Sequence, residues 1–395
     1  MTATPDRTGL PEDARPGPAG LADPVESDGS ALQRYADALA DTGYADLCSS
    51  FNPLFPRPGA WGALAEGSTM PRPLRALVRL FLLGQPVPAA DLVWDTRTGE
   101  GVQLLLRLGL LEQDGADVMS QARLLHLFGL WHFSTEGRAT PVVYVGDDSM
   151  ALLLHSAPSS SATTALDLCA GGGIQSLWAA RSVGHVTAVE LDAEVCRYVS
   201  LNAAMNGLAH RVEVRCGDLY APVRGRRFDH VTANPPLVPI PAGIDYPAVG
   251  DGGPDGLALF WRVIDGMLPA LSPSGTGHVL GTCFSDGVEP ALDRPLARWA
   301  EQRGADVHLT VIARQRLARG QPFFDAVVEV VVAHSGLDRP LAQEAMAELA
   351  DAHGGWLANV VVRLSHGQGR FMTTNLAHGD GGVCQGDRGQ RELRI

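Results

Sequence analysis

Hydrophobic spacing divides the chain into a helical first part and a second part in which strands and helices alternate. Between residue 30 and about residue 133, apolar residues recur every three or four positions, which predicts amphipathic helices. The two clearest stripes are Leu32, Tyr35, Ala36 and Leu39, and Leu74, Leu77, Val78 and Phe81. The second stripe ends at Gly84, a typical helix stop. Residues 101–112 predict a further helix, followed by a polar turn at 113–115 and a β-like stretch.

From Val142 onward, short apolar runs alternate with helical patterns, which predicts an α/β fold with a doubly wound, mostly parallel sheet. Strands are expected at 164–168, 186–190, 212–215, 228–233, 277–283, 307–313 and 326–333. Helices are expected at 174–181, 193–206 and 256–271. No obvious helix joins the last two strands, so we expect them to form an antiparallel edge.

These patterns predict four parts. Residues 1–29, rich in Pro, Gly, Asp and Ala, are expected to form a disordered tail. Residues 30–141 form an N-terminal helical domain, and residues 142–336 hold a seven-stranded, Rossmann-like sheet. Residues 337–395 are expected to be a C-terminal extension with a helix at 341–352, a strand at 358–364 and a loose end from His378.

The helix, turn, helix and small β-wing of residues 30–141 resemble a winged-helix module. Many such modules bind DNA through basic side chains that contact phosphates. Here the second helical region instead carries Asp91, Asp95, Glu100 and Glu112. We therefore expect this domain to serve packing or substrate selection rather than DNA binding.

Composition and charge narrow the class of protein. Hydrophobic residues make up 45% and charged residues 19% of the 395 positions, which indicates a globular chain of two or three domains. The net charge of -13 argues against a large non-specific nucleic-acid surface. The six cysteines have no paired spacing, so we expect neither a metal site nor a disulfide framework. We find no leader and no membrane-spanning run, which predicts a cytoplasmic protein without membrane contact.

A glycine-rich loop follows the first strand of the second part. Residues 167–173 read Asp-Leu-Cys-Ala-Gly-Gly-Gly and precede a helix. Glycines allow a tight turn and let a ligand approach backbone N–H groups, although dinucleotide enzymes share this feature. Glu190 ends the next strand, where a carboxylate can accept ribose hydroxyls, and Asp218 ends the third, where one can hold an adenine amine. Their order predicts a nucleoside-containing cofactor.

Asn234-Pro235-Pro236-Leu237 ends the fourth strand. Two prolines supply no backbone N–H, so the strand must stop there. The Asn234 side chain and the free carbonyls then lie past the carboxyl end of the strand, where open α/β sheets bind ligands. A rigid set of acceptors suits one task well, which is to hold a planar NH2 group by its hydrogens while the nitrogen reacts.

Acidic residues at successive strand ends, followed by Asn-Pro-Pro, resemble the class I S-adenosylmethionine (SAM)-dependent methyltransferases over roughly residues 142–333. The Asn-Pro-Pro turn is similar to that of relatives that methylate planar nitrogen, namely the release-factor glutamine methyltransferases (HemK-like) and the exocyclic-amine nucleic-acid methyltransferases. Residues 252–257, Gly-Gly-Pro-Asp-Gly-Leu, resemble the GGxDGL segment of the glutamine group. The resemblance implies SAM as cofactor, with contacts from Asp167, Cys169, Ala170, Gly171, Gly173, Glu190, Leu191, Asp218, Leu219 and Asn234. It implies catalysis by Asn234, Pro235, Pro236 and Leu237.

Two residues depart from the family pattern. Cys169 replaces the first glycine of the loop D-x-G-x-G-x-G, whereas Gly171 and Gly173 remain. Leu237 replaces the aromatic residue that commonly follows Asn-Pro-Pro and stacks on a planar target. The first change leaves cofactor binding expected, and the second points to a different substrate.

The leading hypothesis is a SAM-dependent N-methyltransferase that acts on an amide or guanidine nitrogen of a protein side chain or small metabolite. One alternative is an RNA or DNA exocyclic-amine methyltransferase, for which a basic stripe would be the footprint. The candidate stripe is Arg211, Arg215, Arg224, Arg226 and Arg227. The other alternative is a winged-helix regulator that senses SAM without catalysis. The acidic balance and Leu237 favour a substrate other than nucleic acid, and the oligomeric state is open.

Overall fold

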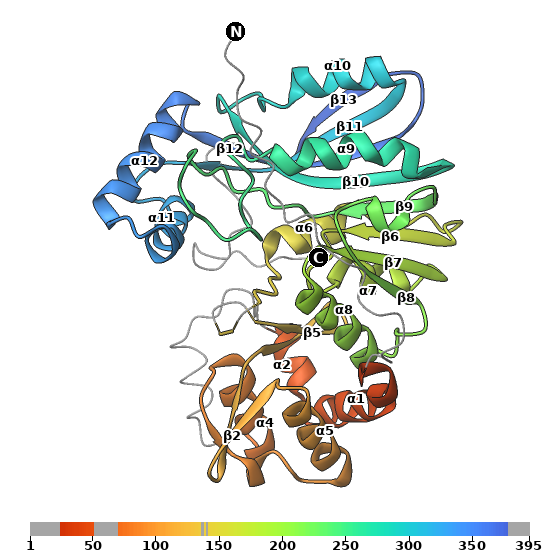
Figure 1. The fold of residues 1–395 in the computed structure, drawn as a ribbon, viewed down its shortest axis with the longest axis vertical. Coiled ribbons are helices and arrows are strands. Elements are labelled where there is room, and N and C mark those ends of the chain that lie inside the picture. The colour runs from red at the N-terminus through yellow and green to blue at the C-terminus, as the bar shows by residue number, and fades with distance from the viewer. Residues whose placement is uncertain (1–23, 51–69, 136–137, 140, 378–395) are drawn as a thin grey trace.

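The structure is a computed structural model, which describes residues 24–50, 70–135, 138–139 and 141–377. Figure 1 shows an N-terminal domain of short helices and hairpins below a large twisted sheet that carries helices on both faces. The tail expected up to residue 29 is shorter than predicted, because helix α1 (Pro24–Asp41) already begins at Pro24. Residues 1–23 and the expected loose end from His378 lie outside the described residues.

The N-terminal domain has the helix, helix and β-wing order that the sequence predicts. After α1 come α2 (Tyr44–Ser50), α4 (Arg72–Leu77) with a π-helical continuation (Val78–Leu82), β1 (Val87–Pro88), a 3-10 turn (Ala89–Asp91) and α5 (Thr96–Arg107). Strands β2 (Leu111–Asp114) and β3 (Asp117–Ser120) then form a small sheet in the order β1-β3-β2. A second hairpin consists of β4 (Arg123–Leu127) and β5 (Leu130–Ser134).

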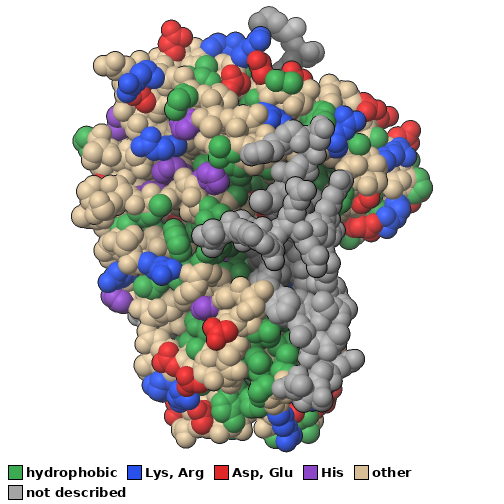
Figure 2. All heavy atoms as spheres, turned by 180° about the vertical axis from the view of Figure 1, so that it is seen from behind, with side chains coloured by type: hydrophobic (Ala, Val, Ile, Leu, Met, Phe, Trp, Pro, Cys, Tyr) green, Lys and Arg blue, Asp and Glu red, His purple; other side chains and the backbone are tan. Residues whose placement is uncertain are grey.

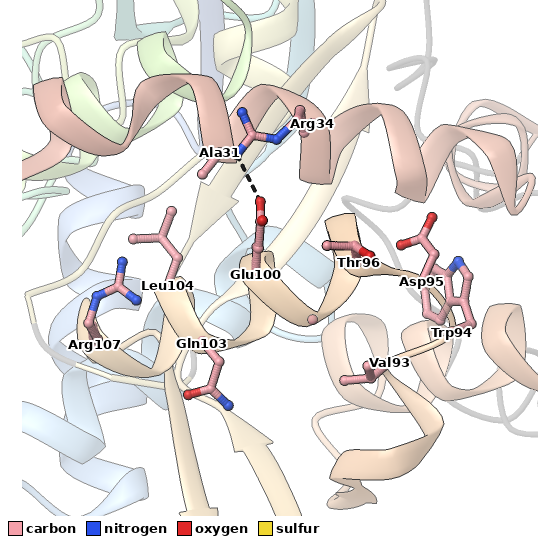
Figure 3. A pocket seen from close by; sticks show the side chains of 11 residues that line it. Ala31, Arg34, Val93, Trp94, Asp95, Thr96, Glu100, Gln103, Leu104 and Arg107 are labelled. Carbon is pink, nitrogen blue, oxygen red and sulfur yellow. Dashed lines mark hydrogen bonds and ion pairs between the residues drawn. The ribbon is translucent and has the colours of Figure 1, made fainter.

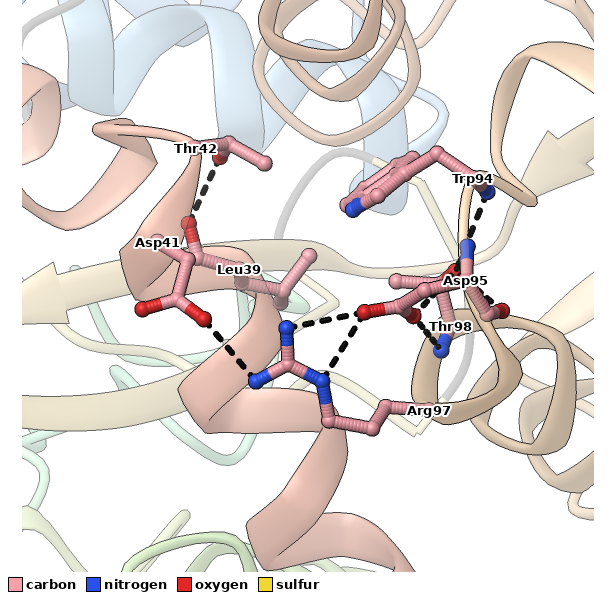
Figure 4. A network of polar contacts seen from close by, with 7 residues as sticks. All are labelled: Leu39, Asp41, Thr42, Trp94, Asp95, Arg97 and Thr98. Atoms are coloured by element: carbon pink, nitrogen blue, oxygen red, sulfur yellow. Dashed lines mark hydrogen bonds and ion pairs between the residues drawn. The ribbon is translucent and has the colours of Figure 1, made fainter.

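Helix α5 begins five residues before the predicted start and ends five before the predicted end. Asp95 caps it, since Asp95 Oδ1 accepts a hydrogen bond from the Thr98 N–H at 2.8 Å, and Thr98 Oγ1 accepts one from the Asp95 N–H at 3.1 Å. Arg97 ties this cap to α1 through Asp41 at 2.8 Å (Figure 4). Leu111 and Glu112, expected in the helix, pair with β3 instead.

The large sheet has eight strands in the described part of the chain, one more than predicted. Their order is β13-β11-β12-β10-β9-β6-β7-β8. The bounds are β6 (Thr164–Leu168), β7 (His185–Glu190), β8 (Val212–Cys216), β9 (Phe228–Ala233), β10 (Leu271–Ser285), β11 (Ala305–Arg316), β12 (Trp356–His366) and β13 (Phe371–Asn375). Strands β8, β7, β6, β9 and β10 are parallel, and β12 is antiparallel to both β10 and β11. The mostly parallel, doubly wound architecture is confirmed.

Helices cover both faces of this sheet. Helices α6 (Asp147–His155), α7 (Ile174–Ala180) and α8 (Ala193–Met205) lie on one face, and α9 (Ala258–Ala270) and α10 (Asp293–Arg303) lie on the other (Figure 1). A short 3-10 turn (Ala221–Val223) precedes β9. The apolar side chains of α9 and α10, such as Ile264 and Leu296, are buried together with Val231 and Val279 of the sheet. Burial of these side chains is the main driving force for the layered fold.

The strand predicted at 326–333 is wrong. These residues belong to helix α11 (Pro322–Ser335), which packs on α12 (Arg339–Ala352). Its buried residues Phe324, Val327, Val328 and Val331 recur at helical spacing, and Pro322 is at the start of the helix, where a missing N–H costs nothing. The run of valines is typical of strands, and tertiary packing overrides that propensity.

The expected C-terminal extension contributes to the sheet. Its predicted helix and strand are present as α12 and β12, but β12 lies between β10 and β11, and β13 adds an edge beside β11. The boundary drawn at residue 336 therefore falls inside the sheet domain.

The two predicted domains share one hydrophobic cluster, which includes Tyr35 and Phe133 of the first and Leu177 and Val199 of the second. Asparagine side chains of α8 also dock strand β5. Asn202 Oδ1 accepts from the Phe133 N–H at 2.8 Å, and Asn206 Oδ1 accepts from the Trp131 N–H at 2.8 Å. The N-terminal domain is thus fixed against the helix that follows β7.

One disulfide is present that the spacing of the cysteines, from which no disulfide framework was expected, does not predict. Cys196 of α8 and Cys216 at the end of β8 are joined, whereas Cys48, Cys169 and Cys283 are free. None of the helices in the described part of the chain is long and apolar enough to cross a membrane.

Candidate functional site

The strand ends that carry the candidate residues meet at one edge of the sheet. Leu168 of β6 pairs with Val189 of β7 and with Ala233 of β9. Three neighbouring parallel strands therefore end at the same level of the sheet, at the glycine loop, Glu190 and Asn234. The register that builds this edge follows from the apolar runs of the strands.

The glycine loop makes a tight turn between β6 and α7. Gly171 and Gly173 have φ of +54° and +85°, and Cys169 adopts φ of +53°, a left-handed conformation that glycine adopts more easily. Asp167 stabilises this turn, because its carboxylate accepts hydrogen bonds from the Ser176 N–H at 3.0 Å and from Thr232 Oγ1 at 3.1 Å. Burial raises the pKa of Asp167 to about 6. Asp167 thus links β6, α7 and β9.

Glu190 lies against the glycine loop. Its Oε2 accepts a hydrogen bond from the Gly171 N–H at 2.8 Å, and its Oε1 accepts one from the Leu191 N–H at 2.7 Å. Beside Gly171 there is open space, since an added Cβ would meet only the Tyr144 carbonyl, at 4.0 Å. The Leu191 side chain is 62% exposed. A carboxylate with spare lone pairs next to accessible backbone fits a bound ribose, so these residues suit SAM.

Asp218 follows β8, which pairs with β7 up to Glu190. Its Oδ2 accepts a hydrogen bond from Arg262 of α9 at 2.6 Å, and the neighbouring Leu219 is buried with φ of +46°. The carboxylate has a second oxygen for an adenine amine. Arg262 was not predicted, because it lies 44 residues further along the chain.

Cys169 is surrounded by acidic groups. Burial raises the pKa of its thiol well above the usual range, and Glu190, Asp167 and Asp218 act in the same direction. The thiolate is the reactive form of cysteine, so Cys169 is poorly suited to act as a nucleophile. The adjacent Ala170 is buried and donates its N–H to the Val189 carbonyl at 3.1 Å.

Asn234 directly follows β9, and only the nitrogen of its side-chain amide has hydrogen-bond partners in the described chain. Its Nδ2 donates to Asp148 Oδ2 at 3.2 Å and to Ser149 Oγ at 3.3 Å, both in the first turn of α6. Its Oδ1 is buried and has no hydrogen-bond partner. Buried acceptors without a partner are rare in folded proteins, because each costs about 1–3 kcal/mol. This oxygen is therefore available to a donor that the chain itself does not supply.

The residues after Asn234 form a stiff wall. Pro235 is buried, and the half-buried Leu237 packs against the cluster of Leu152, Leu280 and Val361. In place of a stacking ring, the structure thus has an aliphatic side chain that contributes to the core between α6 and the sheet.

The Gly-Gly-Pro-Asp-Gly-Leu segment supports this wall directly. The Gly252 N–H donates to the Val238 carbonyl at 2.9 Å, and the Ile240 N–H donates to the Gly253 carbonyl at 3.0 Å. Ile240 is also buried in a cluster with Phe324 and Met346 of α11 and α12. The two motifs and the helical hairpin therefore form one unit beside Asn234.

The basic stripe expected of a nucleic-acid enzyme is largely engaged within the fold. Arg215 and Arg226 both bind Glu213, and Arg211 donates to the Ala180 carbonyl at 2.9 Å. Burial alone would raise the pKa of Glu213, but hydrogen bonds from Arg226, Arg215, His185 and Thr187 lower it to about 2. Over the described part of the face shown in Figure 2, basic and acidic side chains are interspersed.

An open cavity of about 970 Å³ lies in the N-terminal domain, between α1 and α5 (Figure 3). Its lining includes Arg34 and Glu100, which form an ion pair at 2.8 Å, and Trp94. None of its lining residues belongs to the sheet edge. The acidic residues of this region thus pair within the chain, as Asp95 and Glu100 do with Arg97 and Arg34.

Comparison with known proteins finds a family match within the sheet domain. Residues 144–242 match the family model of the methyltransferase small domain. The matched segment, about a quarter of the chain, is similar to this family. The match confirms the predicted class, a domain of the SAM-dependent methyltransferases with SAM as its cofactor. Residues 58–121 match a second family, a domain of unknown function (DUF7059).

Relatives of the small domain differ in their targets. The chain is 31% identical over 168 residues to the release factor glutamine methyltransferase of Moorella thermoacetica, covering 38% of this chain and 59% of that protein. It is 28% identical over 169 residues to the ribosomal protein uL3 glutamine methyltransferase of Bradyrhizobium diazoefficiens, covering 38% and 53%. It is 40% identical over 97 residues to the tRNA1(Val) (adenine(37)-N6)-methyltransferase of an Enterobacter species, covering 23% and 39%. The matched segment thus spans about half, or less, of these relatives.

Solved structures superimpose only loosely. TYW2 from M. jannaschii, in complex with AdoMet, gives a TM-score of 0.37 at 12% identity and covers 62% of this chain and 87% of that one. A SAM-dependent methyltransferase from Agrobacterium tumefaciens gives 0.37 at 18% identity, covering 65% and 71%. Likeness at this level adds nothing to the assignment made from the family match.

Proposed function

We propose that this chain is a SAM-dependent N-methyltransferase that acts on an amide or guanidine nitrogen of a protein side chain or a small metabolite. The observation that carries the proposal is the buried Asn234 Oδ1, which has no partner at the end of β9. A planar NH2 group is a donor that fits this acceptor. The names of the relatives, which include glutamine and adenine amines as targets, support the same chemistry.

In the proposed site, the glycine loop, Glu190 and Asp218 hold the cofactor through backbone N–H groups and carboxylates. Bound SAM supplies an electrophilic methyl group on a sulfonium. Asn234 Oδ1 and the Pro235 carbonyl accept the two N–H bonds of the substrate, which directs the nitrogen lone pair toward the methyl carbon. Both acceptors also stabilise the positive charge that develops on nitrogen.

The transfer needs no strong base before attack. The acceptors of Asn234 and Pro235 would direct the nitrogen toward the methyl group that bound SAM would supply, with the sulfonium sulfur as the leaving atom, and the methylated nitrogen would lose its proton to solvent.

Three features favour a substrate other than nucleic acid. The net charge is -13, Arg215 and Arg226 of the candidate basic stripe pair with Glu213, and Leu237 replaces a stacking ring. The tRNA relative keeps the RNA alternative open to test.

The proposal is tested by methyl transfer to lysate. The chain is incubated with tritiated-methyl SAM and with a lysate separated into protein, RNA and small-molecule fractions, and Asn234→Ala serves as the inactive control. We expect label in the protein or small-molecule fraction. Label in RNA would support the exocyclic-amine alternative, and label in none would support a regulator that senses SAM.

A further inference from the structure

Asp148 contacts the NH2 end of the Asn234 amide. It belongs to the first turn of α6, 86 residues before Asn234, and accepts the Nδ2 hydrogen bond through Oδ2 at 3.2 Å. Ser149 Oγ is the second neighbour of Nδ2, at 3.3 Å. Gln175 of α7 donates to the Ser149 carbonyl at 3.2 Å and so connects this turn to the helix that follows the glycine loop.

The chemistry of these partners decides which end of the amide faces the site. A carboxylate can only accept hydrogen bonds, whereas an amide has a donating NH2 and an accepting oxygen. If the Asn234 amide turned over, Oδ1 would face the Asp148 carboxylate, and two acceptors would meet in a buried position. Such contact is unfavourable in a medium of low polarity. In its ionised form, Asp148 therefore selects the orientation in which Oδ1 points away from α6.

We propose that Asp148 is a positioning residue, which fixes the Asn234 amide so that Oδ1 rather than Nδ2 faces the reacting nitrogen. This inference rests on the proposed function. It explains why an acidic residue lies next to the NH2 end of Asn234, whose Oδ1 is proposed to accept a hydrogen bond from the substrate.

The titratable groups around Asp148 are its neighbour Asp147 and Tyr144, which precedes α6. Burial raises the pKa of Asp148, whereas hydrogen bonds from Asn234 and from Tyr144 act in the opposite direction. A protonated Asp148 becomes a donor and no longer selects one amide orientation. Asn234 positioning is therefore expected to weaken as the pH falls through the pKa of Asp148.

The test compares Asp148→Asn with Asp147→Asn, a matched control one residue away whose carboxyl makes no described contact with Asn234. An asparagine at 148 keeps the size of the side chain but can donate or accept, so the selection is lost. We expect the kcat of methyl transfer in Asp148→Asn to fall roughly tenfold, the loss of one charge-assisted hydrogen bond, with KM for SAM unchanged. Asp147→Asn should keep kcat within about twofold of the wild type. Equal rates in wild type and Asp148→Asn, or equal losses in both variants, would overturn the inference.

A second measurement needs no substrate, so it separates this inference from the proposed function. In protein labelled with ¹⁵N-asparagine, the signal that disappears in Asn234→Ala identifies the Asn234 NH2 group. We expect its shift to follow the titration of a carboxyl in the wild type and in Asp147→Asn, and to lose that dependence in Asp148→Asn. A signal unchanged by Asp148→Asn would refute the inference even if methyl transfer occurs. If no fraction of the lysate accepts label, the proposed function fails, and this titration still decides the role of Asp148.

Discussion

Glu190 Oε2 accepts a hydrogen bond from the backbone N–H of Gly171 at 2.8 Å, which joins the end of β7 to the loop after β6. The same carboxylate accepts the N–H groups of Leu191 and Asp192 through Oε1. One side chain thus orders two loops that come from neighbouring strands. All of these contacts lie within the chain.

Glu190→Gln is expected to weaken SAM binding roughly tenfold, because a neutral amide replaces the charged acceptor of the ribose hydroxyls. Isothermal titration calorimetry with SAM measures the change. Glu194→Gln is the matched control, since Glu194 is an exposed glutamate of α8 that pairs with Arg197. Equal affinities of Glu190→Gln and wild type would contradict the assignment of Glu190 to the cofactor.

Gly256→Ala is expected to destabilise the fold by about 2–4 kcal/mol and to reduce methyl transfer. Gly256 has φ of +77°, and an added Cβ would lie 2.6 Å from the Thr282 carbonyl oxygen and 2.9 Å from that of Leu237. The wall after Asn-Pro-Pro must then move. Urea denaturation and the transfer assay give the two readouts.

Gly243→Ala is the control for that substitution. It has φ of +85°, but nothing lies within 4 Å of its added Cβ, so it incurs only the backbone strain. Its expected cost is about 1 kcal/mol, with methyl transfer retained. Similar losses in the two variants would show that the contact between the two motifs does not matter.

The buried His132 is expected to make stability depend on pH. It lies on β5 beside Gly172, where an added Cβ would be 2.5 Å from its Nε2, and burial lowers its pKa to about 4. The unfolded chain therefore binds a proton more readily than the folded one between pH 6.5 and 4. The contribution of the neutral imidazole is complete above about pH 6.5 and is lost as the pH falls toward 4, by up to about 3 kcal/mol.

The check is the free energy of unfolding of the wild type, His132→Gln and His155→Gln between pH 7 and 4.5. His155 is an exposed histidine of α6, so its variant should keep the wild-type pH dependence. The free energy of unfolding of His132→Gln should depend less steeply on pH than that of the wild type. The contributions of the other titrating groups are common to both proteins and cancel in the comparison. Parallel curves for all three proteins would exclude this role of His132.

Short apolar runs that end at glycine or proline were the most informative part of the sequence. The strands 164–168 and 228–233 match β6 and β9 residue for residue, because each is a short, largely buried run that is followed closely by a glycine or proline turn. The valine run of α11 predicts a strand but forms a helix, since β-branched residues favour strands unless helical packing buries them. The eighth strand, β13, is half-exposed and polar at the sheet edge, so its pairing depends on β11 rather than on its own pattern.

The candidate site likewise contains some residues that the sequence predicts and others that it does not. Glu190, Asp218 and Asn234 are visible in sequence because each directly follows a strand, and parallel strands bring their ends together. Asp148 and Arg262 are not visible, since their contacts with Asn234 and Asp218 depend on how α6 and α9 pack on opposite faces of the sheet. A Gly-Asp-Asp-Ser sequence before an apolar run predicts a helix start, but nothing local connects it to Asn234.

The most direct test of the account is the effect of Asn234→Ala on two separate quantities, the rate of methyl transfer and the affinity for SAM. Asn375→Ala, which removes an exposed amide at the end of β13, is the control. We predict that Asn234→Ala lowers kcat at least 100-fold, as removal of a single transition-state hydrogen-bonding group does in other enzymes, while the Kd for SAM changes less than about threefold. Methyl transfer by Asn234→Ala at the wild-type rate would contradict the account.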